Sequence, residues 1–337
     1  MLRHICPFLI LILLCGVTSD ATAQKHGGTR LYSLIRSADS LLARRYFGAN
    51  IDTLYLSRPT TRWTLKGRVN ISGSAIYLDG TRKGTTYNAI LFSDFKTTLN
   101  ASVSYLGLSV GISINPASWA GKYKDYEFNL NSYSNRWGVD LVYHNQQSAG
   151  GWLQFNGQDK VDIEEGSLLS KTVNVNAYLA FNYRRFSFPA AFSQSYIQKR
   201  SAGSWLLGLS LMGQWLQPGT TNNSTIPMSE LKSINIAIGP GYGYNLVMHH
   251  NWLLHLSAIP SIVIWSNTKT WNGREWHKIS SHVPDVIFTG RAAIVRNFHR
   301  NFMGLSLVAN ISSTGESSLL QIYTTKWRVR AFYGWRL

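Results

Sequence analysis

The residues most able to do chemistry in this sequence are charged side chains that alternate with apolar ones along extended segments. Within residues 63–72, Lys66 and Arg68 lie on one face of an extended chain, and the apolar residues and Gly67 lie on the other. If these segments are strands of a membrane barrel, a charge facing lipid would cost about 2–4 kcal/mol at the middle of the membrane. We therefore expect these side chains to face the interior of the barrel. The positions that the pattern assigns to the inner face are Lys66, Arg68, Asp94, Lys96, Glu127, Asp140, Arg291, Lys326, Arg328 and Arg330.

Most of these inward positions are basic, and a basic interior attracts small anions. If the extended segments close into a barrel, the first strand lies beside the last. Lys66 and Arg68 would then be neighbours of three bases on the last strand: Lys326, Arg328 and Arg330. Like charges on neighbouring strands are unfavourable, so carboxylates, water or a bound anion must lie near this seam. Two interpretations stay open: a stiffening network of internal ion pairs, or an interior that draws anions in.

A different chemistry, hydrolysis of lipid esters, would need a serine activated by a histidine. His144, Asn145 and Ser148 are the best candidates by position, although a solvated loop is the simpler interpretation of these residues. The histidines show no i, i+4 pair of the zinc-protease type. The alternating glycines of residues 239–243 indicate a kink in a strand, or a place in a barrel with little room, rather than a phosphate loop. We therefore expect no catalytic residues, no metal, no cofactor and no enzymatic activity.

The N-terminal residues have the order of a secretory signal. An apolar stretch from Ile5 to Val17 follows Arg3, and a small-residue cleavage site precedes Gln24, which predicts a signal peptide over residues 1–23. The alternative, a lipoprotein signal at Cys15, is disfavoured by the large Leu14 before it. Both cysteines fall within the predicted signal, so a mature chain would have no disulfide and no thiolate metal site.

Composition excludes several classes of protein. The chain has 337 residues, of which 45% are apolar and 15% charged, which argues against disorder and coiled coils. Beyond the first twenty residues no apolar run reaches the roughly 18 residues of a membrane helix. The formal net charge is +17. Because an exported protein rarely meets nucleic acid, we expect lipopolysaccharide, membrane lipid or small anions as partners, and no nucleic acid.

Residues 24–60 are predicted to be an N-terminal periplasmic helix and linker. Between residues 29 and 47, apolar positions step by three and four, as in an amphipathic helix. Such a helix could cover a mouth of the following domain or lie on a membrane surface.

Residues 61–337 change to a period of two, which predicts an all-β fold: an antiparallel transmembrane barrel of about twelve strands. Tight turns at one end and long polar loops at the other favour this barrel over a soluble sandwich. One long connection, residues 184–202, breaks the rule, because it lies at the tight-turn end. The strands are predicted at 63–72, 93–104, 107–114, 125–133, 136–147, 172–183, 203–216, 233–248, 252–265, 285–298, 301–312 and 319–336.

Tryptophans near the predicted strand ends are typical of an aromatic girdle at a membrane interface. The alternative is the ordinary enrichment of aromatic residues in strands. The girdle candidates are Trp63, Trp137, Trp205, Trp215, Trp252, Trp265, Trp327 and Trp335.

Five short stretches occur in a characteristic order: residues 52–55, 104–108, 136–140, 201–204 and 239–245, the last reading Gly-Pro-Gly-Tyr-Gly-Tyr-Asn. In order and spacing they resemble the family called domain of unknown function 4421, predicted outer-membrane proteins of Bacteroidota-type bacteria. The resemblance runs from about Asp52 to Leu337. It implies a barrel in the outer membrane and transfers no catalytic residue.

The sequence therefore predicts a protein of the cell outer membrane that barrel-assembly machinery inserts. The first functional hypothesis is a narrow channel or binding barrel whose basic interior favours small anions. The alternatives are a non-conducting structural or surface-interaction barrel with an ion-paired interior, and a membrane-embedded lipid hydrolase.

Overall fold

The computed structural model describes residues 36–37, 39–41, 43–44, 50–82, 85–93, 95–106, 108–116, 126–218, 230–271, 275–279, 285–316 and 320–337. The predicted signal peptide lies outside the described residues. The described residues between 36 and 44 are helical, within the segment predicted as an amphipathic helix. In this described part of the chain, no helix is long and apolar enough to cross a membrane.

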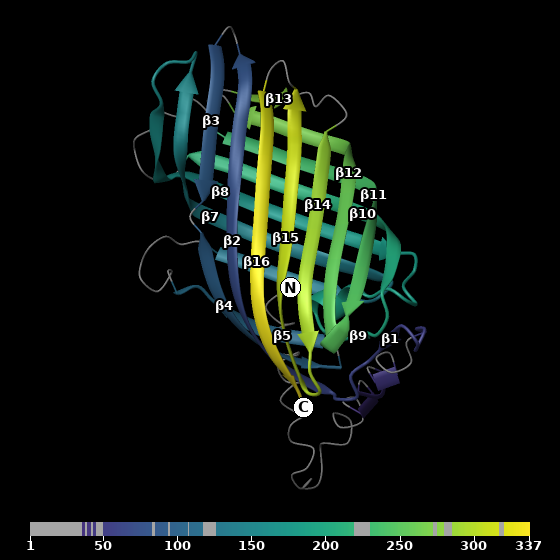
Figure 1. The fold of residues 1–337 in the computed structure, drawn as a ribbon. Coiled ribbons are helices and arrows are strands. Elements are labelled where there is room, and N and C mark those ends of the chain that lie inside the picture. The colour runs from purple at the N-terminus through teal and green to yellow at the C-terminus, as the bar shows by residue number, and fades with distance from the viewer. Residues whose placement is uncertain are drawn as a thin grey trace, which may run out of the picture.

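The chain folds as an antiparallel β-barrel, as predicted (Figure 1). The first long strand pairs with the last over residues 64–80 and 320–336, which closes the sheet on itself. Closure pairs the edges of β2 and β16, which would otherwise lack hydrogen-bond partners. The strands of this 14-stranded sheet are β2 (Trp63–Arg82), β3 (Thr85–Ser93), β4 (Lys96–Tyr105), β5 (Leu108–Ile114), β6 (Tyr126–Tyr133), β7 (Trp137–Phe155), β8 (Val161–Ala180), β10 (Ala202–Pro218), β11 (Glu230–Met248), β12 (Trp252–Trp271), β13 (Trp276–Ile279), β14 (Val286–Asn297), β15 (Asn301–Glu316) and β16 (Leu320–Arg336).

The sheet that forms the wall of the barrel has different strand pairings at its two ends. Toward the long loops, β3 lies between β2 and β7 and pairs with both. Toward the tight turns, β4 takes the place beside β2 and pairs with β5, while β7 pairs with β6. No pairing between β5 and β6 occurs among the described residues. The wall therefore forks at the break between β3 and β4.

Several strands are longer than predicted. Residues 73–82 and 85–92, expected in a loop, continue β2 and form β3, and β7, β8 and β12 extend into segments 148–171 and 266–284 in the same way. The prediction was wrong here because these segments contain many polar residues and resemble loops, although apolar residues still occupy alternate positions along them. Ile76, Leu78 and Leu91 are buried inside the barrel at that level.

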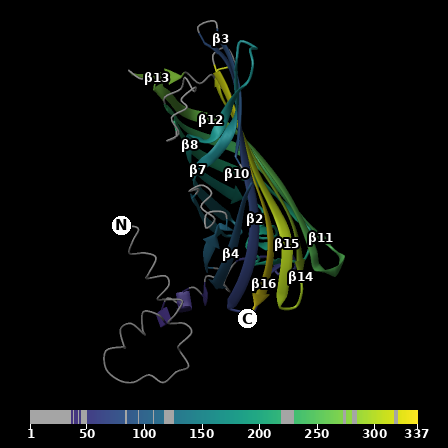
Figure 2. The same cartoon turned by 90° about the vertical axis from the view of Figure 1, so that its left-hand side faces the viewer.

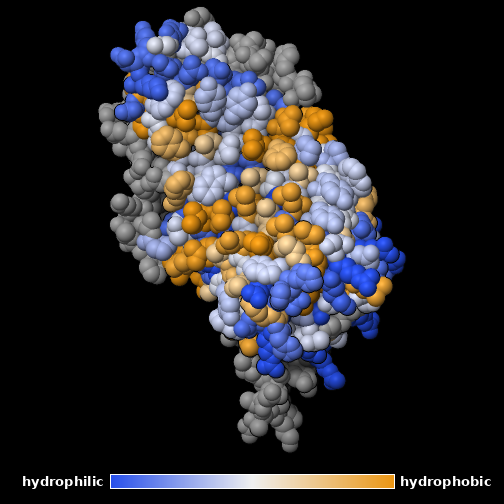
Figure 3. Space-filling view, viewed as in Figure 1, coloured by the Kyte–Doolittle hydropathy of each residue, from blue (hydrophilic) through white to orange (hydrophobic). Residues whose placement is uncertain are grey.

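The outer surface carries a belt of apolar side chains between two polar ends (Figure 3). Leu207, Leu209 and Leu211 on β10 are examples of exposed apolar residues at alternate positions. Exposed apolar bands of this kind face lipid in membrane barrels. Of the predicted girdle, Trp137, Trp205, Trp265 and Trp335 are exposed and Trp63, Trp215, Trp252 and Trp327 are half-buried.

The long connection at the tight-turn end, residues 184–202, folds into the barrel and is called the plug below. It contains the short helix α4 (Phe188–Phe192), whose N-cap Ser187 accepts a hydrogen bond from the Ala190 N–H. Phe186 and Phe188 are fully buried and pack with Tyr178 and Phe302 of the wall. Burial of each such ring stabilises the fold by about 1.5–3 kcal/mol. The plug therefore closes the tight-turn end of the lumen with an apolar core.

The plug is also tied to the segment that precedes the barrel. Its strand β9 (Ile197–Gln198) pairs with β1 (Leu56–Ser57) in a separate two-stranded sheet. Further out, Asp39 of the N-terminal helix contacts Arg62 and Tyr105 at the barrel rim. Figure 2 shows this helix beside the tight-turn end of the barrel, the end at which the C-terminus lies.

A second apolar layer lies inside the barrel toward the long loops and is called the upper layer below. It joins side chains from β2, β3, β7 and β16 to others from β10 and β11 on another part of the wall. The lumen is therefore apolar at both ends, and the polar side chains lie between these layers. The members of the upper layer are Ile76, Leu78, Ala89, Leu91, Leu153, Leu216, Leu231 and Ile322.

Candidate functional site

A cavity of about 80 Å³ lies in the polar part of the lumen. Strands β2, β4, β7, β8, β14, β15 and β16 contribute to its lining. The period of two explains most of this lining, since every second residue of each strand points inward. Gly73 and the girdle candidate Trp327, which lie between such positions, also line the cavity. Its charged lining residues are Lys96, Asp140, Arg291, Lys326, Arg328 and Arg330, and its uncharged polar lining includes Ser72, Ser74, His144, Thr172, Asn174, Asn176 and Asn310.

The structure places most of the predicted inward charges inside the barrel. Lys66, Lys96 and Arg291 are buried. The half-buried group comprises Arg68, Asp140, Lys326, Arg328 and Arg330. Asp94 lies outside the described residues, and so does the side chain of Glu127. Among the described side chains lining the cavity, five are basic and one is acidic.

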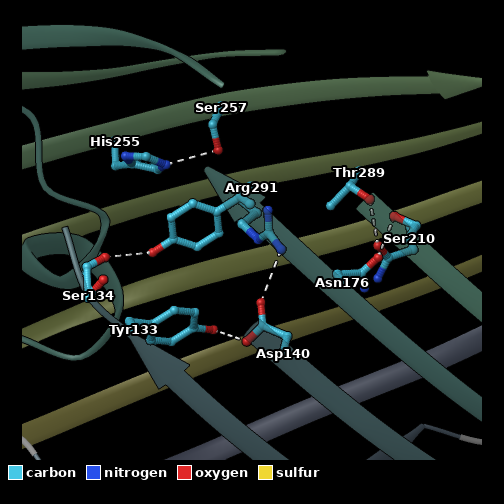
Figure 4. Close-up of polar contacts among 11 residues, drawn as sticks. Tyr133, Ser134, Asp140, Asn176, Ser210, His255, Ser257, Thr289 and Arg291 are labelled. Carbon is cyan, nitrogen blue, oxygen red and sulfur yellow. Dashed lines mark hydrogen bonds and ion pairs between the residues drawn. The ribbon is translucent and has the colours of Figure 1, made fainter. Parts of the chain in front are cut away.

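The acidic side chain, Asp140, joins two parts of the wall that are not neighbours in the sheet. Its carboxylate lies 3.0 Å from the Arg291 guanidinium and also accepts a hydrogen bond from the Tyr133 hydroxyl (Figure 4). Arg291 is on β14, whereas Asp140 is on β7. This ion pair crosses the lumen and compensates one of the basic side chains.

Two bases at the seam between β2 and β16, Lys66 and Arg68, donate hydrogen bonds to neutral acceptors. In the register, Arg330 is opposite Asn70 and Lys66 is opposite Gly334, so the bases are staggered rather than paired directly. The Arg68 guanidinium donates to Asn100 Oδ1 at 2.8 and 2.5 Å. Lys66 Nζ donates to the plug at Gln194 Oε1 (2.6 Å) and Ser193 O (3.1 Å). For Lys66 and Arg68, amide and carbonyl oxygens thus take the place predicted for carboxylates, water or an anion.

Beside Arg291 of the cavity lining, three polar side chains form a chain of hydrogen bonds. His255 Nδ1 lies 2.7 Å from Asn245 Oδ1, and His255 Nε2 lies 3.0 Å from the Ser257 hydroxyl (Figure 4 shows the latter contact). Asn245 is directly opposite His255 in the pairing of β11 with β12. Ser257 is directly opposite Arg291 in the pairing of β12 with β14. Register therefore brings this group, called the Asn245–His255–Ser257 triad below, together beside Arg291 of the cavity lining.

The histidine and asparagine candidates named from the sequence lie on opposite faces of β7. His144 lines the cavity, but Asn145 is the next residue of the same strand and points to the opposite face. The side chain of Ser148 is outside those that the structure describes. The triad was missed, although a signal for it exists in the sequence. The tight turn at residues 249–251 fixes the register that pairs Asn245 with His255.

Metal binding has no support in the described part of the chain, where no three His, Cys, Asp or Glu side chains gather to hold an ion.

Comparison with solved structures finds bacterial outer-membrane proteins. The outer membrane protease OmpT from Escherichia coli is 6% identical, with a TM-score of 0.41 over 83% of this chain and 98% of that chain. The outer membrane protein OprG from Pseudomonas aeruginosa is 11% identical, with a TM-score of 0.28 over 83% of this chain and 97% of that chain. The translocator domain of autotransporter NalP from Neisseria meningitidis is 8% identical, with a TM-score of 0.29 over 91% and 99%. Likenesses this distant transfer no activity.

Comparison by sequence gives a more specific result. The profile of the family described as domain of unknown function DUF4421 matches residues 50–337, which confirms the resemblance carried by the short motifs. No curated protein matches the chain.

Proposed function

The chain belongs to the DUF4421 family, and from that premise we propose that it is an outer-membrane barrel that binds a small oxyanion in its lumen. The observation that carries the proposal is the charge of the cavity. Lys96, Arg291, Lys326, Arg328 and Arg330 line it, against Asp140 as the one acid among the described lining residues. Bases gathered in a cavity with low-dielectric walls favour an anion strongly.

The size and donors of the cavity favour an oxyanion such as phosphate. A water-sized position needs about 10–15 Å³, so a cavity of about 80 Å³ offers room for a handful of heavy atoms. Arginine presents parallel N–H donors that match two oxygens of a phosphate or carboxylate. A single halide cannot use that geometry.

Binding suits the lumen better than conduction. The plug fills one end and the upper layer fills the other, so an ion crossing the barrel would pass through two apolar layers. Removing an ion from water into such a layer costs several kcal/mol. The alternative of a purely structural, ion-paired barrel draws on the Arg291–Asp140 pair, which compensates one of the five cavity bases.

The outer-membrane location and lipid partners belong to the same proposal. The apolar belt (Figure 3) supports contact with membrane lipid. Insertion by barrel-assembly machinery, contact with lipopolysaccharide and export by a cleaved signal remain predictions from the sequence.

Calorimetric titration of the detergent-solubilised protein with inorganic phosphate, sulfate and chloride tests the binding. We expect binding of phosphate or sulfate that chloride does not match. The double variant Arg328→Gln/Arg330→Gln should weaken it at least about tenfold, because each charge-assisted hydrogen bond contributes about 1.5–3 kcal/mol. The control is Arg200→Gln, at an exposed position outside the cavity. Absence of oxyanion binding in the wild type would overturn the proposal.

A further inference from the structure

We propose that the Asn245–His255–Ser257 triad is an activated-serine site that cleaves carboxylic esters, an activity separate from anion binding. A serine becomes a nucleophile when a histidine takes its proton and a third group orients that histidine. The hydrogen bonds from His255 to Ser257 (3.0 Å) and to Asn245 (2.7 Å) have this arrangement.

The hydrogen-bond partners of Asn245 determine the tautomer of His255. Both N–H donors of the Asn245 amide are used, because Nδ2 donates to Ser187 O and to Gln198 Oε1, each at 2.9 Å. The atom that Asn245 turns to His255 is therefore its oxygen, which only accepts. Nδ1 of neutral His255 must carry the proton, and Nε2 is left to accept one from Ser257. This is the tautomer that a general base needs.

The three residues are held on rigid elements. His255 and Ser257 are two positions apart on β12, on the same face, and Asn245 is the direct partner of His255 on β11. All three are buried. Strand positions fixed by register hold side-chain geometry better than loops do.

The surroundings indicate the class of ester. On the plug side, the rings of Phe186, Phe188 and Phe192 lie 5.9, 4.9 and 5.1 Å from the His255 ring, centroid to centroid. On the cavity side, Arg291 is the cross-strand partner of Ser257. An ester with an apolar acyl chain and a nearby anionic group matches an aromatic wall on one side and a guanidinium on the other.

The reaction balances without any further reagent than water. Ser257 Oγ forms a bond to the acyl carbon as His255 Nε2 takes its proton. The carbon–oxygen bond to the alcohol then breaks, and the alcohol leaves with that proton. Water attacks the acyl-serine, gives a proton through His255 back to Ser257, and releases the carboxylic acid.

The plug keeps this site closed. His255 is 0% exposed and Ser257 4% exposed, and Phe188 and Phe192 of α4 lie against the His255 ring. Substrate can reach Ser257 only when α4 moves, while Ser187 and Gln198, on either side of α4, hold Asn245. We therefore expect a low basal rate that rises when the packing of α4 is weakened.

The test is labelling by a fluorophosphonate probe, which bonds covalently to activated serines, followed by peptide mapping of the labelled residue. In the folded, detergent-solubilised protein we expect slow labelling at Ser257 and faster labelling in Phe188→Ala. His255→Gln should slow labelling by about 10²–10⁴-fold, the usual contribution of a general base. Ser257→Ala should abolish it. The matched control is Ser261→Ala, because Ser261 is also buried on β12 but outside the triad.

The outcomes separate clearly. No labelling in either the wild type or Phe188→Ala overturns the proposal, and so does labelling that His255→Gln leaves unchanged. Heat-modifiable migration on a gel shows for each variant that the barrel is folded. Because the phosphate test changes Arg328 and Arg330 and the ester test changes Ser257 and His255, loss of one activity leaves the other to be judged independently.

Discussion

Arg291 on β14 and Asp140 on β7 form a 3.0 Å ion pair across the lumen, although their strands are not neighbours in the sheet. The Arg291 side chain is 4% exposed and that of Asp140 is 13% exposed. A charge with so little contact with water is costly unless its partner stays in place. The pair therefore contributes to holding two distant parts of the wall together.

We predict that Asp140→Asn lowers the free energy of unfolding by about 3–5 kcal/mol, because it leaves the buried Arg291 without its carboxylate. Urea titration followed by heat-modifiable migration measures the change. Asp79→Asn is the control, since Asp79 is an exposed acid on β2 and its change should stay within about 0.5 kcal/mol. If Asp140→Asn behaved like this control, water or a bound anion would be compensating Arg291 instead.

The second prediction is that the wild-type barrel does not conduct steadily in a planar lipid bilayer. The phenylalanines of the plug and the aliphatic side chains of the upper layer close both ends of the lumen. Recording in symmetric KCl, with a reconstituted open porin as the positive control, measures this. A steady anion-selective current would support the channel hypothesis and contradict the closed lumen.

The barrel and the inward face of its strands could be predicted because the period of two decides which side chains face lipid. That pattern assigns Arg328 and Arg330 to the inner face, and the tight turns identify which strands are neighbours. The Gly-Pro-Gly-Tyr-Gly-Tyr-Asn stretch also alternates, with Tyr242 and Tyr244 exposed outside and Gly243 inside.

The plug and the upper layer inside the lumen could not be predicted, because they depend on contacts between residues far apart in the sequence. A side chain built on Gly243 would come within 2.9 Å of Phe186, so this glycine leaves room for the plug. Nothing in the period of a strand reveals which loop folds inward. The same holds for the Asp140–Arg291 pair, whose partners are separated by 151 positions.

The third prediction concerns the orientation of the barrel. Because both cysteines lie at positions 6 and 15, within the predicted signal, single cysteines introduced into the mature chain can be labelled without background. His250→Cys places one in the exposed tight turn after β11, and Asp159→Cys places one in the exposed connection between β7 and β8. With tight turns in the periplasm, a membrane-impermeant maleimide applied to whole cells should label Asp159→Cys alone. Labelling of both in lysed cells is the control, and the reverse pattern on whole cells would invert the barrel.

The last prediction concerns Lys66, which ties the plug to the wall from its position on β2. Its ammonium group is buried and donates to Gln194 Oε1 at 2.6 Å and to Ser193 O at 3.1 Å. Lys66→Met keeps an unbranched chain of similar length but leaves two buried acceptors without this donor, at a cost of about 1–3 kcal/mol. We expect faster hydrogen exchange in residues 188–198 and little change in the upper layer, since the closure of β16 on β2 does not depend on the ammonium group. Lys269→Met is the control, because Lys269 is exposed on β12 far from the plug. Equal exchange in the two variants would mean that the phenylalanines alone hold the plug in the barrel.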